Sequence, residues 1–266
     1  MSNPTSSSSS EPMVRLRDLS VTFSGGRKPV HAVSGVSLEV QRGEVVALIG
    51  ESGSGKSVTL RTLLRLHPER RTRIGGQVRV AGRDVLAMPA RELDDFRGKV
   101  ASMIFQEPLL ALDPVYSVGA QIVESIRRHD RKATAAEAQQ RALALFERVR
   151  IPSPERRLAA YPHEMSGGMR QRAMIALALA CKPQLLLADE PTTALDATVQ
   201  IQILLLLREL QRDLGLSVIF VTHDIGAAVE VLKNPQHPYT RALLAATIRG
   251  DVIEEQHVTV QASELG

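Results

Sequence analysis

The sequence contains few of the residues that stabilise small secreted proteins or anchor proteins in membranes. It has one cysteine, Cys181, and no tryptophan in 266 residues. A single cysteine excludes internal disulfides and cysteine-based zinc clusters, and it suits a reducing compartment. The longest apolar run, "IQILLLL" at 201–207, is far shorter than the roughly 20 residues that cross a bilayer. We therefore expect a soluble protein that touches a membrane only peripherally.

Charge and composition narrow the classes of partner. The net charge is +4, and the basic residues are scattered along the chain, so we expect no nucleic-acid partner. Hydrophobic residues make up 44% of the chain and charged residues 23%, which is ordinary for a globular protein. Residues 1–12 are a polar, serine-rich tract without the apolar core of a signal peptide. We expect this tract to be a disordered leader.

The pattern of apolar residues predicts an α/β fold. Residues 44–50 are nearly all apolar, which predicts a strand buried on both faces. From about residue 108 to residue 164 the spacing is helical, which predicts a helical subdomain. Strands that alternate with helices after it indicate a parallel sheet. We expect strands at 14–23, 31–40, 44–50, 77–82, 100–105, 184–190 and 217–224, and helices at 56–66, 91–99, 167–181 and 197–215, the last capped by Gly215.

The strongest local signal is "GESGSGKS", which lies between the apolar strand at 44–50 and a helix. It fits the pattern G-x-x-x-x-G-K-[ST], whose glycines let backbone N–H groups surround phosphates at the positive end of a helix. Lys56 can reach the β- and γ-phosphates, and Ser57 can ligate Mg²⁺. The sequence therefore predicts a nucleotide site made of Gly50, Glu51, Ser52, Gly53, Ser54, Gly55, Lys56 and Ser57.

Two shorter signals accompany this loop. In "LLLADEP" a buried strand delivers two carboxylates at its carboxyl end, where Asp189 can hold Mg²⁺ and Glu190 can polarise an attacking water. Taken alone, such a pair more often caps a helix or faces solvent.

In "HEMSGGMRQR" a helix start at Ser166, Gly167 and Gly168 offers a second set of open N–H groups. A glycine pair before a helix is usually only a turn. Since the first loop already forms one phosphate site, a second anion site would need a separate functional explanation.

In order, the loop, "SGGMRQR", "LLLADEP", "ALDAT" and a strand that ends in histidine resemble the ATP-binding subunits of ABC transporters. The resemblance runs from Val14 to Leu244. "MIFQEPLLALDPVYSVGAQIVE" and "NPQHPYTRALL" are similar to the oligopeptide, dipeptide and nickel importers in particular. The resemblance implies a P-loop NTPase (RecA-like) core with a parallel sheet, an N-terminal antiparallel β subdomain and a helical subdomain at about 108–164. It places the ATPase domain at 13–250 and a C-terminal tail at 251–266.

The resemblance also implies roles for individual residues. Gln106 corresponds to the glutamine that senses the γ-phosphate and Mg²⁺, and His223 to the switch histidine near the γ-phosphate. Ser166, Gly167 and Gly168 correspond to the signature that contacts ATP held by the opposite subunit, which supplies the reason for a second anion site. Asp196 corresponds to the aspartate of the D-loop. Together with Asp189, Ser57 and the base Glu190, these residues make up the expected catalytic, nucleotide and metal contacts.

Some positions depart from the family or stay open. Met165 stands where leucine is usual in the signature, a near-isosteric change, and Met169 replaces a glutamine of the wider family as it does in this importer group. Phe23 and His31 are candidates for stacking on adenine, although the sequence favours Phe23 as a core residue of its strand.

The resemblance implies a function as well as a fold. The chain is expected to bind ATP and Mg²⁺ and to hydrolyse ATP so that peptides or a related small solute, such as nickel, are taken up. Its expected partners are a second ABC ATPase subunit, identical or related, two transmembrane permease subunits and, indirectly, an extracytoplasmic solute-binding protein. The expected location is the cytoplasmic face of the cell membrane.

Two alternatives remain at this stage. The chain could be a paralogue that keeps its motifs but does not hydrolyse ATP or assemble, or a soluble ABC ATPase without a transport role. The first gains weight at Val231–Leu232, where the family places two short strands and a turn that this sequence lacks. Three explanations of the missing segment stay open: natural variation that the fold accommodates, a loss that lowers stability, or an error in the coding sequence.

Overall fold

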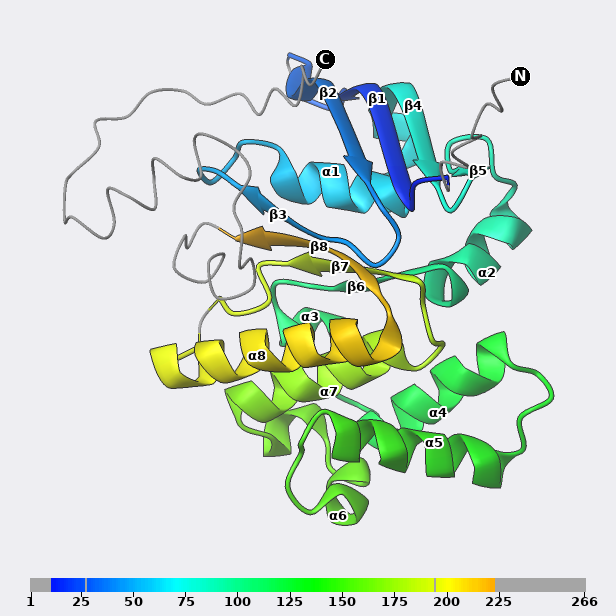
Figure 1. The fold of residues 1–266 in the computed structure, drawn as a ribbon, viewed down its shortest axis with the longest axis vertical. Coiled ribbons are helices and arrows are strands. Elements are labelled where there is room, and N and C mark those ends of the chain that lie inside the picture. The colour runs from blue at the N-terminus through cyan, green and yellow to red at the C-terminus, as the bar shows by residue number, and fades with distance from the viewer. Residues whose placement is uncertain (1–10, 27, 194, 223–266) are drawn as a thin grey trace, which may run out of the picture.

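The computed structural model describes residues 11–26, 28–193 and 195–222, which form two sheets with helices between and below them (Figure 1). The first sheet is antiparallel and has the order β2-β1-β4-β5. Its central strand β1 (Val14–Phe23) pairs on one side with β2 (Val30–Val40) and on the other with β4 (Thr72–Val80). The short β5 (Arg83–Asp84) completes it. This sheet confirms the expected N-terminal antiparallel part.

The second sheet is parallel and has the order β3-β8-β7-β6. Its strands are β3 (Val45–Ile49), β8 (Ser217–Thr222), β7 (Leu185–Asp189) and β6 (Ala101–Ile104). Because parallel strands all point the same way, their carboxyl ends lie along one edge of the sheet. In such sheets ligands bind at that edge.

Helices cover both faces of the parallel sheet. Helix α1 (Lys56–Leu63) lies between the two sheets, whereas α7 (Gly167–Leu179) and α8 (Ala197–Leu214) lie on the opposite face (Figure 1). Alternate residues of β7 therefore belong to different cores. Leu185 and Leu187 join the core with α1 and the antiparallel sheet, and Leu186 and Ala188 join the core with α7 and α8.

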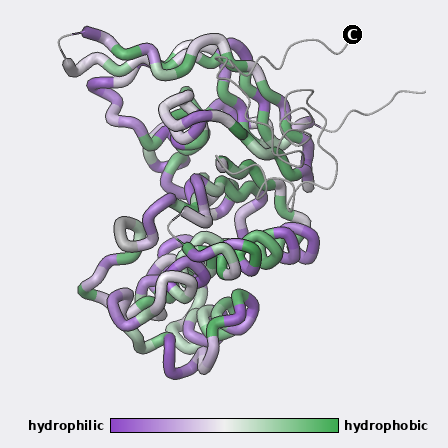
Figure 2. The backbone as a smooth tube through the Cα atoms, turned by 90° about the vertical axis from the view of Figure 1, so that its left-hand side faces the viewer, coloured by the Kyte–Doolittle hydropathy of each residue, from purple (hydrophilic) through white to green (hydrophobic). Residues whose placement is uncertain are grey.

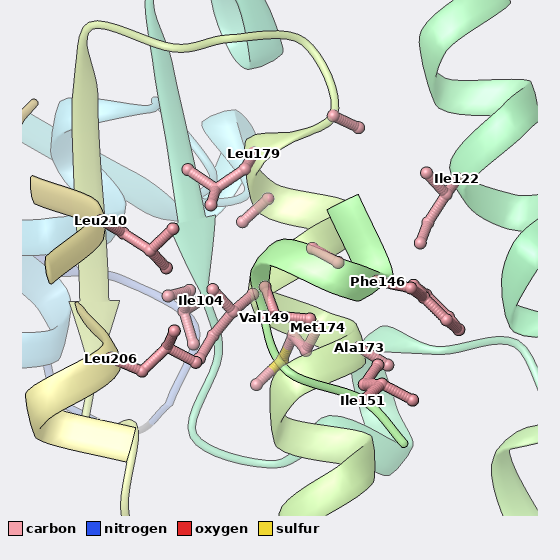
Figure 3. Packing of buried hydrophobic residues seen from close by; sticks show 14 of the residues in the cluster. Ile104, Ile122, Phe146, Val149, Ile151, Ala173, Met174, Leu179, Leu206 and Leu210 are labelled. Atoms are coloured by element: carbon pink, nitrogen blue, oxygen red, sulfur yellow. The ribbon is translucent and has the colours of Figure 1, made fainter. Parts of the chain in front are cut away.

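The segment from Pro108 to Glu164 is helical, as expected, and no strand occurs among its described residues. It contains α3 (Pro108–Ala111), α4 (Val118–His129), α5 (Ala135–Arg148), α6 (Pro154–Leu158) and the short 3₁₀ helix η2 (Pro162–Glu164). Figure 3 shows how side chains of α4 and α5 meet those of α7, α8 and β6 in one hydrophobic cluster. In Figure 2 hydrophobic stretches run through the strands, and hydrophilic ones gather on outer loops and helix turns.

Helix ends are fixed by local hydrogen bonds. Thr134 and Glu137 form a reciprocal capping box at the start of α5, and the Ser117 side chain caps α4. Gly215 ends α8 in the left-handed conformation at φ 63°, as the sequence predicts. Across the described ranges, no helix has the length and apolar character that a membrane span requires.

Several expected boundaries are wrong. Strand β4 begins at Thr72 instead of residue 77, because Gly75 and Gly76 continue the strand through a shift in its register with β1. Gly76 has φ 86°, and a Cβ there would lie 2.4 Å from the Asp18 carbonyl oxygen. Helix α1 ends at Leu63, where residue 66 was expected, because Arg65 turns to φ 49°. Helix α2 (Ala90–Lys99) contains a break at Gly98.

The expectation that β3 is buried on both faces is also wrong. All five of its residues are only partly buried. Among the described strands β3 pairs with β8 alone, so it forms an edge of the parallel sheet. The strand expected at 217–224 is seen up to Thr222, and the apolar stretch and join at 225–232 lie outside the described residues.

Candidate functional site

The loop Gly50–Ser57, here called the phosphate loop, connects the end of β3 to the start of α1. Gly53 and Gly55 have φ angles of 83° and 89°, which L-residues with side chains rarely adopt. A Cβ on Gly55 would lie 2.4 Å from the carbonyl oxygen of Ala32 in β2. The glycine at this position thus lets the backbone of the antiparallel sheet pack directly against the loop.

The Lys56 side chain curls back into the phosphate loop. Its Nζ donates to the carbonyl oxygens of Gly50 (2.6 Å) and Glu51 (2.5 Å) and lies 3.1 Å from Ser54 Oγ. Burial lowers the pKa of Lys56, and this effect outweighs the nearby carboxylates Glu190 and Asp189, which raise it. The hydrogen bonds hold the Lys56 amine inside the loop, where a phosphate would meet it. Ser52 lies exposed in the same loop.

Ser57 and Asp189 meet across the space between α1 and β7. Ser57 Oγ donates to Asp189 Oδ1 at 2.6 Å. The Asp189 side chain is fully buried, and its Oδ2 has no hydrogen-bond partner among the described residues, although the Arg61 guanidinium lies 3.6 Å away. Burial raises the pKa of Asp189. A hydroxyl and a carboxylate beside an unsatisfied oxygen are the hard donors that Mg²⁺ prefers, so these residues fit that ion.

Glu190 follows Asp189 but points to different partners. Its φ of 46° turns the chain sharply at the end of β7. Its Oε2 accepts hydrogen bonds from Gln106 Nε2 (3.1 Å) and Thr193 Oγ1 (2.9 Å). Gln106 comes shortly after the end of β6, so the carboxyl edge of the sheet brings it to Glu190 as the motif order suggests. Hydrogen bonds from Gln106 and Thr193 therefore orient this carboxylate.

The segment Ser166–Gly168, here called the signature, starts α7. Ser166 Oγ accepts from the backbone N–H of Met169 at 3.3 Å, which confirms the expected N-cap. The structure does not bring the signature to the phosphate loop of the same chain, because α1 and α7 cover opposite faces of the parallel sheet (Figure 1). One chain therefore presents the two helix ends that were predicted to bind anions in two separate places.

Gly168 also has a packing role that the sequence did not reveal. A Cβ on it would lie 2.9 Å from Val199 Cγ1 in α8, whereas a Cβ on Gly167 would lie 3.4 Å from Leu195 Cδ2. The second glycine thus sets how closely α7 and α8 approach, and the first does not.

This difference gives a paired stability prediction. Gly168→Ala is expected to lower the free energy of unfolding by about 1 kcal/mol, because the new methyl overpacks against Val199. Gly167→Ala is the matched control and should change it little. Adding Val199→Ala to Gly168→Ala should recover part of the loss, so that the two changes are not additive in a denaturant-unfolding cycle. Additive losses would contradict the packing role.

Asp196 caps the start of α8. Its side chain accepts from the backbone N–H of Val199 at 3.0 Å, so in this chain the expected D-loop aspartate serves as an N-cap. His223 follows Thr222, the last residue of β8, directly in sequence and lies outside the described residues. Its expected place at the γ-phosphate therefore stays a prediction.

The two candidates for adenine stacking differ in their surroundings. Phe23 is partly buried against the core, and its ring packs edge-on against His67 with ring centroids 5.4 Å apart. This contact favours the core interpretation of Phe23. His31 is exposed, and its Nδ1 lies 3.0 Å from Thr22 Oγ1. Met165 is buried in the core around α7, where a side chain close in size to leucine fits.

Sequence reasoning missed two residues that contact the acidic pair. Thr193 stands three residues after Glu190 and hydrogen-bonds its side chain. Arg61 stands one helical turn after Ser57 and faces Asp189. The spacing of Arg61 was a usable signal, because residues four apart on a helix lie on the same face.

A phosphate loop between a strand and a helix, with an acidic pair at the end of a neighbouring parallel strand, defines the class of P-loop nucleotide-binding proteins. The profile of the ABC transporter family matches residues 33–193. The chain belongs to this family. It is accordingly a nucleotide-binding protein and an ATPase that serves transport, and the fold class and family expected from the sequence are confirmed.

Individual relatives agree with this assignment. The chain is 46% identical over 254 residues to the probable peptide ABC transporter ATP-binding protein y4tR of Sinorhizobium fredii, covering 87% of this chain and 76% of that protein. It is 47% identical over 263 residues to the peptidoglycan transport ATP-binding protein YejF of Agrobacterium fabrum, covering 91% of this chain and 48% of that protein. The dimeric ATP-binding cassette MJ0796, solved in a post-hydrolysis state with ADP and Pi, superposes with a TM-score of 0.73 at 31% identity, covering 82% of this chain and 91% of that one.

Proposed function

We propose that the chain powers an importer that takes up peptides or a related small solute, such as nickel. The relatives named above are described as peptide and peptidoglycan transport ATP-binding proteins. The segments "MIFQEPLLALDPVYSVGAQIVE" and "NPQHPYTRALL" resemble the sequences of importers of this kind. The observation that carries the ATPase part is the pair of contacts Ser57–Asp189 and Gln106–Glu190 at one edge of the parallel sheet.

The proposed chemistry is mainly positioning and electrostatics. Lys56 and the backbone N–H groups of the phosphate loop bind the β- and γ-phosphates. Glu190, oriented by Gln106 and Thr193, accepts the proton of the attacking water. Mg²⁺, held by Ser57 and Asp189 with Gln106 nearby, would supply positive charge that neutralises the phosphate oxygens. His223 is proposed to contact the γ-phosphate.

The proposed active unit is a pair of chains arranged head to tail, identical or related. Because α1 and α7 lie on opposite faces of the sheet, the signature of one chain can reach a phosphate only on another chain. Ser166, Gly167, Gly168 and Asp196 would thus complete the partner's nucleotide site. Support comes from MJ0796, which is described as a dimer.

We further propose the partners and layout that the resemblance implies. Two transmembrane permease subunits bind the pair at the cytoplasmic face of the membrane, and an extracytoplasmic solute-binding protein delivers the solute. Within the chain we propose a leader at 1–12, the ATPase domain at 13–250 with its helical subdomain at about 108–164, and a tail at 251–266.

Reconstitution tests this proposal. The chain is combined with its permeases in vesicles, ATP hydrolysis is measured with and without them, and uptake of labelled di- to hexapeptides is compared with uptake of glutathione and Ni²⁺. The expected result is ATP-dependent peptide uptake and faster hydrolysis when the permeases are present. Nucleotide binding without hydrolysis in either state would favour the non-hydrolysing paralogue and overturn the importer.

A further inference from the structure

Arg61 and Ser57 approach the same buried carboxylate from one stripe of α1. They stand four residues apart, so their side chains lie on the same face of the helix. Ser57 Oγ donates to Asp189 Oδ1 at 2.6 Å, and Arg61 Nη2 lies 3.6 Å from Asp189 Oδ2. Helix α1 thus places a hydroxyl at one oxygen of the carboxylate and a positive charge at the other.

The charge balance around Asp189 makes Arg61 important. The Asp189 side chain is 0% exposed, and a buried carboxylate needs a counter-ion. In the part of the chain that the structure describes, Arg61 alone forms an ion pair with Asp189. Lys56 also acts on Asp189 through its charge, but its Nζ is hydrogen-bonded within the phosphate loop, and Glu190 adds a second negative charge nearby.

Arg61 itself is not locked in place. Its side chain is 46% exposed, so the guanidinium can move toward solvent while the stem stays on α1. A distance of 3.6 Å is an ion-pair distance and not a hydrogen bond. The arrangement is therefore a loose counter-ion at the oxygen that Ser57 leaves open.

We propose that Arg61 is a positioning residue that competes with Mg²⁺ for the negative charge of Asp189. By this competition it sets the Mg²⁺ concentration at which the protein binds nucleotide. The inference rests on the proposed Mg²⁺ site at Ser57 and Asp189. A positive charge beside a cation site repels the cation, and it also neutralises part of the carboxylate charge that would attract it. At low Mg²⁺ the same charge stabilises the buried carboxylate.

Removing the charge should therefore strengthen Mg²⁺-dependent nucleotide binding and destabilise the metal-free protein. Arg61→Leu is expected to lower the Mg²⁺ midpoint for nucleotide binding by about 3- to 10-fold, a range reduced for the partial exposure of Arg61. The same variant should melt at a lower temperature than the wild type in EDTA, because Asp189 loses its counter-ion. Arg61→Lys keeps the charge and should stay within about twofold of the wild-type midpoint.

The experiment uses the full chain and N-methylanthraniloyl-ATP as a fluorescent probe, titrated with Mg²⁺ after metal removal. Arg91→Leu is the matched control, since Arg91 is an exposed arginine on α2, and its midpoint should equal that of the wild type. If Arg61→Leu does not fold, Arg61→Gln removes the same charge with a polar side chain and is judged by the same midpoint.

The outcomes separate the inference from the function on which it rests. A lower midpoint in Arg61→Leu, with Arg61→Lys and Arg91→Leu unchanged, supports the competition. An unchanged or higher midpoint in Arg61→Leu overturns it while leaving a Mg²⁺-dependent wild type, and hence the proposed site, intact. Wild-type binding that does not respond to Mg²⁺ would instead remove the proposed metal site, and the inference with it.

Discussion

Glu190→Gln is expected to lower ATP turnover by about 100- to 10,000-fold, the usual contribution of a general base. ATP affinity should change little. Glutamine has the size of glutamate and can still accept a hydrogen bond from Gln106 or Thr193, which both donate to Glu190 Oε2. It cannot take the proton of an attacking water. The measurement is phosphate release at saturating ATP, beside nucleotide binding by fluorescence.

The matched control for this change is Glu155→Gln, the same substitution at an exposed position on α6. It should leave both turnover and binding as in the wild type. Normal turnover in Glu190→Gln would refute the base assignment, whereas loss of binding together with turnover would show that the substitution had damaged the site.

Gly55→Ala is expected to be the most damaging small substitution in the phosphate loop. The added Cβ would lie 2.4 Å from the Ala32 carbonyl oxygen and 3.1 Å from Val33 Cγ2, at a φ of 89°. Strain and clash together should cost on the order of 3 kcal/mol in the free energy of unfolding. Nucleotide affinity should fall about 100-fold, because the N–H groups at the start of α1 are displaced.

Gly43→Ala separates strain from clash. Gly43 has φ 73°, but a Cβ on it would meet no atom within 4 Å. This control should lose about 1 kcal/mol of stability, as expected for a left-handed alanine, and should keep its nucleotide affinity. Denaturant unfolding and nucleotide titration give both values. Equal losses in Gly43→Ala and Gly55→Ala would show that the contact with Ala32 is unimportant.

The sequence predicted those parts of the site in which chemistry fixes residue type and spacing together. The phosphate loop, the acidic pair after β7 and the Ser166 cap each need particular residues at fixed offsets, so they could be recognised one by one. The alternation of strands and helices likewise indicated the parallel sheet. The start of β4 was missed because the expected strand began only after Gly75 and Gly76, which the structure includes in β4 at a shift in register with β1.

Other features depend on contacts between distant segments. Nothing in "VVALI" shows that β3 pairs with only one of the described strands, because the apolar pattern records burial in general and not strand order. The contact of Arg61 with Asp189 joins residues far apart in the chain, and the role of Gly168 depends on Val199 in the next helix. Such pairs emerge only when the chain is folded.

The separation of the two helix ends, α1 above the parallel sheet and α7 below it, has a consequence for inheritance. In the proposed pair, each nucleotide site is built from residues of both chains. A mutation in the phosphate loop harms the site on its own chain, but a mutation at Ser166 harms the site on its neighbour. In a mixed pair, an altered signature would therefore impair the nucleotide site whose phosphate loop belongs to the normal chain.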